Sequence, residues 1–416
     1  MRIWSVVVAS VMFLMCAAVA GGEEGFQSLF NGKDLTGWDG DPRLWSVKDG
    51  VIHGETTEEN SISENTFLIW RGGKLKDFEL RLEFRIQNGN SGVQYRSRDL
   101  GEWHVAGYQA EVCNEPSVGF LYHERGRGGL ARVGQFVEID ARGNKNVVGS
   151  VADLDNVDYF NPQDWNEYAI IARGNHIVHK LNGFTTAELI DNDPNGRALE
   201  GILALQIHVG PPMIVEFKDI RVKHLDAGYG NALRLFNGKD LTGWTYSADE
   251  LKDTWSVKDG VLHNTGKPVG YLRTTDEFTN YVLRLQLRHI TAGNGGVLLR
   301  MVGEDRVWPR SIEAQGQYGA LGDIWNIGGF PMKTAPERTR GRHTRKAHPS
   351  NEKPVGQWNE YEITLDGADL ELKVNGLVQN IATDCWETPG KICLQSEGSE
   401  MEFRNLVLIP IKGPMG

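Results

Sequence analysis

The chain has 416 residues, a formal net charge of -11 at pH 7 and a sequence pI near 5.5. Its length is enough for two or three domains, and its acidic balance argues against nucleic acid or another polyanion as a partner. Its four cysteines form no CxxC pair, which excludes a cysteine-rich metal site.

The first twenty residues have the pattern of a cleaved export signal. Arg2 gives a positive start, residues 3–19 are almost wholly apolar, and Ala18-Val19-Ala20 fits a signal peptidase site. The apolar run is short for a membrane anchor, and the bulky Met15 disfavours a lipid anchor on Cys16. We therefore expect a signal peptide over 1–20, a periplasmic or secreted protein, and no stable membrane span after cleavage.

The remainder of the chain is a tandem duplication. The ten residues LFNGKDLTGW occupy positions 29–38 and recur without change at 235–244. Further blocks repeat in the same order, such as WSVKDG at 45–50 and 255–260. Colinear repeats at this spacing predict two copies of one fold, over residues 26–225 and 233–411, with only a short hinge between them.

Apolar residues in both copies alternate with a period of two. In FELRLEFRI, residues 78–86, the apolar side chains share one face and the charged ones share the other; residues 281–290 repeat this pattern. Asp-Gly or Asn-Gly pairs separate such stretches, as at 49–50 and 182–183, and favour tight hairpins. The sequence therefore predicts an all-β sandwich or jelly roll in each copy, without long helices.

Two features of the second copy leave alternatives open. The basic segment KTAPERTRGRHTRKAH, residues 333–348, fits a solvated inserted loop, and also fits a lid or a contact for an anionic glycan. Cys385 and Cys393 could form a disulfide in an oxidising compartment.

Several of the repeated blocks carry a family resemblance. LFNGKDLTGW, WSVKDG, NSGVQYR, WNEY, LNG and LQIH resemble the secreted bacterial 3-keto-disaccharide hydrolases, which include 3-keto-glucoside 1,2-lyases and 3-keto-2-hydroxy-glucal hydratases. The likeness covers both copies. It implies two tandem concanavalin A-like jelly rolls, each with two stacked antiparallel sheets and a carbohydrate site on a concave face. It also implies an exported enzyme that cleaves 3-keto-glycosides by elimination across C1 and C2, followed by hydration.

That reaction sets chemical requirements. A ketone at C3 acidifies the hydrogen on C2, so a base can remove it and the oxygen on C1 can leave. The site needs a base, a divalent metal ion or an arginine to stabilise the enediolate, and an acid for the leaving group. It does not need the carboxylate pair of an ordinary glycosidase.

Two strand patterns in the first copy meet these requirements. In GYQAEV, Gln109 and Glu111 project from one face, and in ALQIH, Gln206 and His208 do the same. With the family resemblance, we expect Glu111 and His208 to bind a divalent metal ion of unknown identity or to act as base and acid. The alternative is a satisfied polar pair on a solvated sheet.

Other residues are expected around this pair. Arg96 ends a strand and could hold the enediolate or sugar hydroxyls, although an ordinary ion pair is an equal alternative. Two segments are expected to form the rim, with candidate sugar-binding side chains at Trp103, His104, Tyr122 and His123, and with Glu124 beside them. His53 and His263 occupy equivalent positions, which suggests a structural hydrogen bond in each copy.

The second copy keeps only part of this set. Alignment of the repeats places Glu313 at the position of Gln109 and Gln315 at that of Glu111, so acid and amide are exchanged. Glu397 replaces His208. The residue types are kept at Arg300 and Gln395, and Asp323 and Trp325 are additional candidates for a rim. Either the second copy prefers a different ligand or it serves binding and packing, so we expect the active site in the first copy.

A non-catalytic function is the competing hypothesis. The same kind of concave sheet forms the binding face of lectins, and a duplicated lectin gains avidity from two modest sites. Either function predicts a carbohydrate as the partner, an oxidised 3-keto-glycoside in the case of the enzyme.

Overall fold

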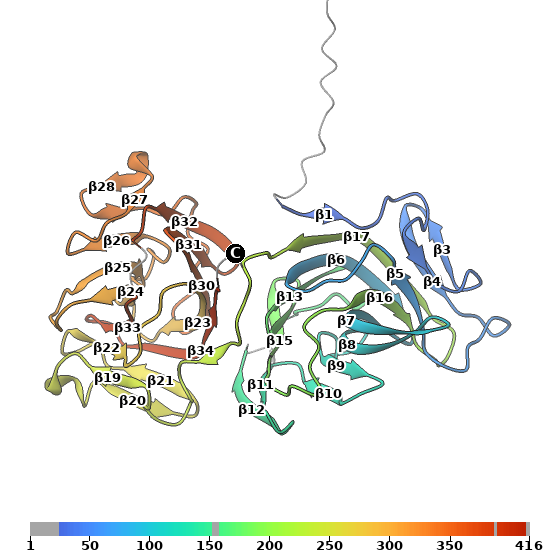
Figure 1. The fold of residues 1–416 in the computed structure, drawn as a ribbon, viewed down its shortest axis with the longest axis horizontal. Helices are drawn as coiled ribbons and strands as arrows, with labels where there is room; N and C mark the ends of the chain where they lie inside the picture. Colours follow the sequence, from blue (N-terminus) through green and yellow to red (C-terminus); the bar gives the residue numbers. More distant parts are fainter. Residues whose placement is uncertain (1–24, 152–157, 387–388, 413–416) are drawn as a thin grey trace, which may run out of the picture.

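The computed structural model describes residues 25–151, 158–386 and 389–412. The predicted signal peptide lies outside the described residues. The chain forms two all-β halves that lie side by side, and each half is a concanavalin A-like jelly roll of two sheets (Figure 1). Within the described ranges, none of the helices is long and apolar enough to cross a membrane.

The first half contains a ten-stranded and a seven-stranded sheet. The ten-stranded sheet runs in the order β12 (Lys145–Ser150), β11 (Gln135–Ile139), β15 (Phe184–Asp191), β14 (His176–Leu181), β13 (Asn166–Arg173), β6 (Phe78–Gln87), β17 (Ile214–His224), β4 (Val51–Glu55) and β3 (Trp45–Lys48), with β1 (Gln27–Ser28) beside β17. The seven-stranded sheet runs in the order β10 (Gly128–Ala131), β9 (Leu121–Glu124), β8 (His104–Cys113), β7 (Asn90–Gly101), β16 (Ile202–Ile207), β5 (Thr66–Trp70) and β2 (Trp38–Asp39).

The second half repeats this plan with a nine-stranded and an eight-stranded sheet. The nine-stranded sheet runs in the order β20 (Trp255–Lys258), β21 (Val261–Asn264), β34 (Met401–Pro410), β23 (Tyr281–His289), β30 (Asn359–Asp366), β31 (Asp369–Val374), β32 (Leu377–Thr383) and β27 (Lys333–Thr334), with β18 (Leu233–Arg234) beside β34. The eight-stranded sheet runs in the order β19 (Trp244–Tyr246), β22 (Gly270–Thr274), β33 (Lys391–Ser396), β24 (Gly296–Val302), β25 (Arg310–Gln315), β26 (Ile324–Ile327), β29 (His343–Thr344) and β28 (Thr339–Arg340). The helical segments in the described chain are the short 3-10 turns η1 (Asp249–Leu251) and η2 (Pro336–Arg338).

Strand β6 shows why this sequence folds as a sandwich. Its apolar side chains at alternate positions from Phe78 to Ile86 are buried in the core, and the charged residues between them are only partly buried on the other face. The two-residue pattern therefore assigns one face of the sheet to the core, as predicted. The Asn-Gly pair Asn182 and Gly183 has φ values of 48° and 82° and closes the β14–β15 hairpin, also as predicted.

The larger sheets of the two halves pack against each other. Apolar side chains from both halves form one small cluster, which includes Phe136 and Ile190 of the first half and Val282 and Val407 of the second. This contact explains why β23 is buried on both faces at its start, where the sequence pattern predicted one solvated face. The smaller sheets consequently lie on opposite outer sides of the molecule (Figure 1).

Two expectations about the second half need correction. The basic segment 333–348 is not wholly a loop, because it contributes β27 to one sheet and β28 and β29 to the other. Cys385 and Cys393 are separate, buried free thiols. Cys385 lies in the core of the sandwich, whereas Cys393 packs with Tyr271 in a different cluster, so the suggested disulfide is absent.

Candidate functional site

The polar site residues of the first half share the outer face of its seven-stranded sheet. Alternate residues of β8, such as Tyr108 and Ala110, enter the core, so Gln109 and Glu111 project from the opposite face. The same alternation in β16 buries Leu205 in the core and leaves Gln206 on the outer face, and continues to His208. The predicted placement of both polar pairs on one face is confirmed.

This outer face is concave. The Gln206 Nε2 atom lies 3.4 Å from the Glu124 Oε2 atom, although β7 and β8 separate their strands β16 and β9. Neighbouring strands are about 4.8 Å apart, so on a flat sheet two strands three positions apart would be separated by about 14 Å, too far for this contact. The sheet must therefore curl around this face and bring its polar side chains together.

A chain of amides holds the Glu111 carboxylate. Gln94 Nε2 donates to Gln109 Oε1 at 2.6 Å, and Gln109 Nε2 donates to Glu111 Oε2 at 3.0 Å. Asn90 donates to the other carboxylate oxygen of Glu111. Gly92 makes room for this arrangement, because a Cβ atom there would lie 2.4 Å from the Gln109 Cδ atom. The carboxylate is thus fixed in position, while burial raises its pKa against the effect of these donors.

His208 is half-buried near Glu111, and its charge would lower the pKa of that carboxyl. Its Nδ1 atom lies 2.6 Å from the backbone oxygen of Val209. Since a carbonyl oxygen can only accept, Nδ1 carries a proton, and in the neutral ring the lone pair is on Nε2. His208 can therefore accept a proton or bind a metal ion through Nε2.

A buried apolar cluster and a large cavity adjoin the polar side chains of this concave face. Phe67, Ile69, Val105 and Ala204 form a buried cluster on the same concave face. A cavity of about 860 Å³ opens at this end of the sheet, and its lining includes residues 61–64 and the pair Trp103 and His104. Glu111 and His208 do not line this cavity, so the polar group and the cavity are neighbouring parts of one face.

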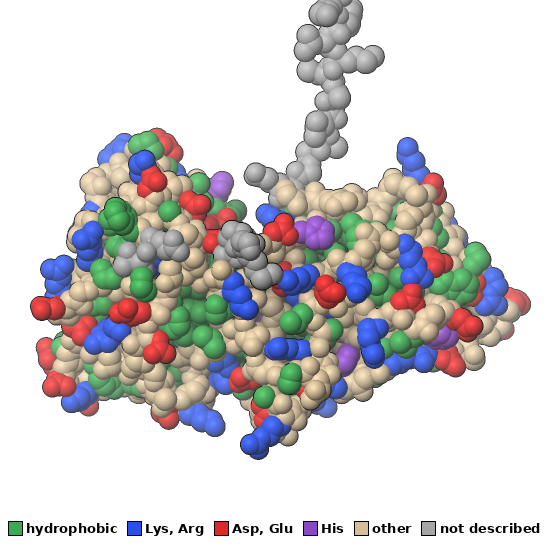
Figure 2. Space-filling model, in the orientation of Figure 1, with side chains coloured by type: hydrophobic (Ala, Val, Ile, Leu, Met, Phe, Trp, Pro, Cys, Tyr) green, Lys and Arg blue, Asp and Glu red, His purple; other side chains and the backbone are tan. Residues whose placement is uncertain are grey.

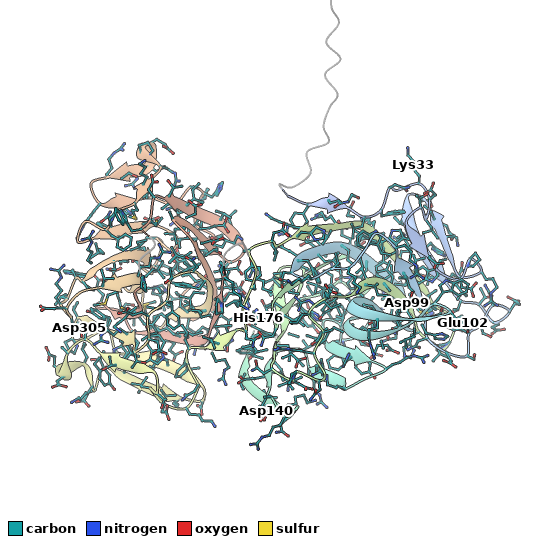
Figure 3. The ribbon with its side chains drawn as sticks, in the orientation of Figure 1. Lys33, Asp99, Glu102, Asp140, His176 and Asp305 are labelled. Carbon is teal, nitrogen blue, oxygen red and sulfur yellow. The ribbon has the colours of Figure 1, made fainter. Side chains whose placement is uncertain are left out.

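Trp103 and His104 line this cavity. Trp103 belongs to the two-residue turn between β7 and β8 and has a φ of 58°, a conformation that is costly for a bulky side chain. A hydrogen bond of 2.9 Å from its Nε1 atom to Asp39 Oδ1 holds the ring there. His104 Nε2 lies 3.5 Å from Glu64 Oε2. Asp99 and Glu102 of the same hairpin lie on the outer side of the first half (Figure 3).

The structure does not bring Arg96 to this face. Its guanidinium group is buried, donates to the backbone oxygens of Lys76 and Gly174, and pairs with Asp77 at 3.0 Å. Arg300 is equally buried in the second half and donates to three backbone oxygens. Both arginines join the edges of the sandwich, which corrects the expectation that they contact substrate.

His123 also lies on the opposite side of the sheet from Glu111. Its ring stacks on Tyr108 at 5.4 Å, and its Nδ1 atom accepts a hydrogen bond from Arg127. Burial and the charge of Arg127 lower the pKa of His123 to about 4. The neighbouring Tyr122 is paired with Gln109 in the strand register and shares its face. Tyr122 therefore remains a candidate rim residue, whereas His123 does not.

Three polar residues of the site were not among the predicted candidates. Gln94 lies within the NSGVQYR block, where its alternation with the apolar Val93 and Tyr95 could have revealed it. Asn65 joins the cavity wall to the polar group, because it donates to Glu124 and accepts from the Val209 backbone. Asn90 follows a tight turn, and nothing in the sequence alone shows its contact with Glu111.

The second half confirms the exchange of acid and amide. Glu313 is paired with Leu298 as Gln109 is with Gln94, and Gly296 is paired with Gln315 as Gly92 is with Glu111. Gln395 occupies the position of Gln206, since it is paired with Tyr271 where Gln206 is paired with Phe67. The second concave face therefore presents a different polar set on the same backbone plan.

The donor set of the first half is compatible with a divalent cation. Glu111 offers carboxylate oxygens, His208 offers a ring nitrogen, and the buried Gln206 Oε1 atom has no hydrogen-bond partner in the described residues. His, Cys, Asp and Glu side chains do not form a group of three or more close enough for a metal in the described part of the chain. Any cation here would thus need the amide oxygen and further ligands from water or substrate.

Three known proteins are similar to parts of this chain. The chain is 32% identical to the 3-keto-disaccharide hydrolase of Bacteroides thetaiotaomicron over 85 residues, which are 18% of this chain and only 29% of that relative. A crystal structure from Parabacteroides distasonis assigned to the glycosyl hydrolases aligns with 45% of this chain and 94% of its own, at 20% identity and a TM-score of 0.34. The carbohydrate-binding module CBM66 of Bacillus subtilis aligns with 39% and 93%, at 11% identity and a TM-score of 0.31.

The family assignment itself covers both halves. Residues 25–223 and residues 231–409 each match the domain described as 3-keto-alpha-glucoside-1,2-lyase-like. Together the two matches take in most of the chain, including every strand of both concave sheets. The protein belongs to this family of carbohydrate-active, hydrolase-type domains and carries two copies of its domain in tandem.

Proposed function

We propose that the first half cleaves 3-keto-glycosides by elimination across C1 and C2 followed by hydration. The observation that carries this proposal is the meeting of Glu111 and His208 on one concave face, within a matched family domain. The adjoining cavity and its Trp103 rim give a sugar ring space and an aromatic surface. The relative from Bacteroides thetaiotaomicron, named for 3-keto-disaccharides, supports the same substrate class.

Proton transfer is the central step. The C3 ketone makes the C2 hydrogen acidic, and the His208 Nε2 lone pair accepts that proton. Electrons of the C2–H bond form a C1–C2 double bond, and the C1–oxygen bond breaks. The leaving oxygen takes a proton and departs as an alcohol. Water then adds across the double bond, so that hydroxyl joins C1, hydrogen returns to C2, and the net reaction is hydrolysis.

Glu111 is the group we propose for protonating the leaving oxygen. Burial raises its pKa, which favours the protonated form that an acid requires, and the Asn90 and Gln109 donors fix its orientation. The buried amides around it also exclude bulk water from the reacting atoms. Such a group can add about 10²-fold or more to the rate.

A divalent cation is part of the proposal in a second form. Glu111, His208 and the Gln206 amide oxygen would hold it, and it would supply positive charge for the enediolate oxygens. The His208 Nε2 lone pair serves either as base or as ligand, so the two forms are mutually exclusive for this nitrogen. Adding a chelator distinguishes the two forms of the proposal, because only the form with a bound cation should lose activity.

The decisive experiment is turnover of a 3-keto-glucoside by the purified protein, with and without a chelator. We expect product release, and a fall of about 10²-fold or more in kcat for Glu111→Gln while the melting temperature stays close to that of the wild type. Loss of activity on chelation would support the cation form. Binding of the sugar without any turnover would instead support a lectin, the alternative function for this fold.

Export is a separate proposal, made from the pattern in residues 1–20. The mature protein is expected to begin after Ala20 in the periplasm or outside the cell. Sequencing the amino terminus of protein from the exported fraction tests this. An intact Met1 would contradict it.

A further inference from the structure

Asn65 connects two separate parts of the first concave face. It lies directly before β5, and its Oδ1 atom accepts a hydrogen bond of 2.9 Å from the backbone N–H of Val209, two residues beyond β16. Its Nδ2 atom donates at 3.3 Å to the Oε1 atom of Glu124, at the end of β9. A backbone N–H only donates and a carboxylate only accepts, so the two partners together fix the direction in which the Asn65 amide points.

The residue that Asn65 holds is also the residue that holds the ring of His208. The His208 Nδ1 atom lies 2.6 Å from the backbone oxygen of Val209, while the N–H of Val209 donates to Asn65. The same segment is attached again at Met213, whose backbone N–H and C=O both bond to Thr56. Asn65 and Thr56 therefore hold the two ends of this segment, and Asn65 holds the end that carries the imidazole.

This attachment decides where the His208 proton lies. A neutral imidazole carries its proton on Nδ1 or on Nε2, and the hydrogen bond made by one nitrogen selects between them. The Val209 carbonyl can only accept, so it selects the proton on Nδ1 and leaves the lone pair on Nε2. His208 is half-buried and Val209 is 39% exposed, so packing alone does not keep this carbonyl beside the ring. The hydrogen bond from the Val209 N–H to Asn65 does.

The second half replaces the whole arrangement. The strand registers of the two halves match Asn65 with Val269, Glu124 with Ile327 and His208 with Glu397. Valine and isoleucine have no polar side-chain atom, and a carboxylate has no ring tautomer that needs to be selected. The amide Gln206 is nevertheless kept, as Gln395. The contacts of Asn65 and Glu124 thus occur in the copy that has the histidine, which indicates that they serve the histidine and not the sheet.

We propose that Asn65 is a positioning residue for His208. Acting through Val209, it keeps the His208 ring in the tautomer and orientation in which Nε2 can accept a proton, and Glu124 keeps the Asn65 amide in place. This inference rests on the function proposed above for His208. Because Asn65 orients the base and does not hold the sugar, its loss should lower kcat and leave KM nearly unchanged.

The test is the tautomer of His208 in the full chain, read by NMR from the chemical shifts of its ring nitrogens and assigned with His208→Gln. We expect the wild-type ring to carry its proton on Nδ1, and Asn65→Leu to give a mixture of both tautomers. In Asn65→Leu, kcat for a 3-keto-glucoside should also fall about ten-fold or more. Val269→Leu, the matched change in the second half, should alter neither the tautomer nor kcat.

A double variant separates positioning from damage to the fold. Asn65→Asp combined with Glu124→Gln exchanges donor and acceptor between the two side chains. The new carboxylate still accepts from the Val209 N–H, and the new amide donates to that carboxylate. We expect this double variant to keep the wild-type tautomer of His208 and to recover most of kcat, with melting curves establishing that each variant is folded.

Three results would overturn the role of Asn65. They are a wild-type ring protonated on Nε2, an unchanged tautomer in Asn65→Leu even if kcat falls, and a folded double variant that does not restore the tautomer. A wild-type protein that does not turn over a 3-keto-glucoside would refute the proposed function instead. The tautomer measurement needs no turnover, so it would still decide whether Asn65 positions His208.

Discussion

Gly92 has no side chain, and the space this leaves lets Gln109 take its position beside Glu111. A methyl group there would press on Gln109, so Gly92→Ala should displace Gln109 and release Glu111 from the amide chain. We expect kcat for a 3-keto-glucoside to fall about ten-fold or more, with overpacking costing about 1–3 kcal/mol of folding free energy. Gly210→Ala, where nothing lies within 4 Å of the added carbon, is the control. Equal losses in both variants would contradict this assignment.

Arg96 is expected to matter for stability and not for substrate binding. Arg96→Gln removes the partner of a buried Asp77 and leaves the Lys76 and Gly174 carbonyls without a donor. Breaking a buried ion pair costs about 3–5 kcal/mol, so the melting temperature should fall markedly. The fraction that remains folded should keep its KM, because this guanidinium does not reach the concave face. A raised KM with unchanged stability would restore Arg96 to the substrate site.

The site residues show which side-chain positions can be predicted from the sequence and which cannot. Alternation along a strand assigns Glu111 and His208 to one face because side-chain direction depends only on local backbone geometry. Arg96 was expected at the end of a strand, but it lies within β7, where its φ of 46° marks an irregularity and its side chain is buried away from the concave face. His123 was misplaced for another reason: the segment that carries it was expected to be a rim loop, and the structure shows that it is strand β9.

At the scale of elements, the two hairpins that follow the WNEY blocks are built alike. Asn375 has a φ of 47°, and its side chain accepts from the Glu360 backbone at 2.8 Å and donates to Asn359 at 2.9 Å. Asn182 makes the equivalent contacts in the first half. The asparagine thus closes its own turn and attaches it to the neighbouring strand.

Asn375→Ala should therefore destabilise the second half specifically. The change loses three side-chain hydrogen bonds, to the Glu360 backbone, to Asn359 and to the Asn351 backbone, and places alanine in a left-handed conformation, at a cost of about 1–3 kcal/mol. Urea unfolding followed by hydrogen exchange should show weaker protection in β31 and β32 than in β14 and β15. Asn375→Gly, which tolerates the positive φ, should recover part of the loss. Uniform loss across both halves would argue against a local role.

At the scale of the molecule, charge buried between the halves could not be foreseen from either copy alone. Arg173 of the first half meets Glu362 of the second at 2.9 Å, and Arg284 of the second meets Glu188 of the first at 2.8 Å. Figure 3 shows His176, which lies 2.7 Å from Glu188, at this junction. On the outer surface, acidic and basic side chains are interspersed (Figure 2). The alternation along a strand cannot distinguish the charged residues at the junction from those on the outer surface, because it is the docking of the two halves that buries the former.

This junction should make the association of the halves sensitive to acid. Burial alone would raise the pKa of Glu360, but the charges of Lys180 and Arg284 outweigh it and lower the pKa to about 2. A carboxyl with a lowered pKa in the folded state adds stability above its unfolded value of about 4.5, and this stability is lost as pH falls toward 2. The same sign holds for Glu362, whose pKa is also lowered.

We therefore expect the two halves to unfold together at pH 7 and as separate transitions between about pH 4 and pH 2, because the protonated carboxyls leave Arg173 and Arg284 buried without partners. Scanning calorimetry at pH values between 7 and 2 measures the number of unfolding transitions. Glu360→Gln should move the onset of the split to higher pH. Asp249→Asn, which removes an exposed ion pair with Lys252, should not. A single transition that persists to pH 2 would mean that apolar contacts such as Val282 with Phe136 hold the halves together without the buried charges.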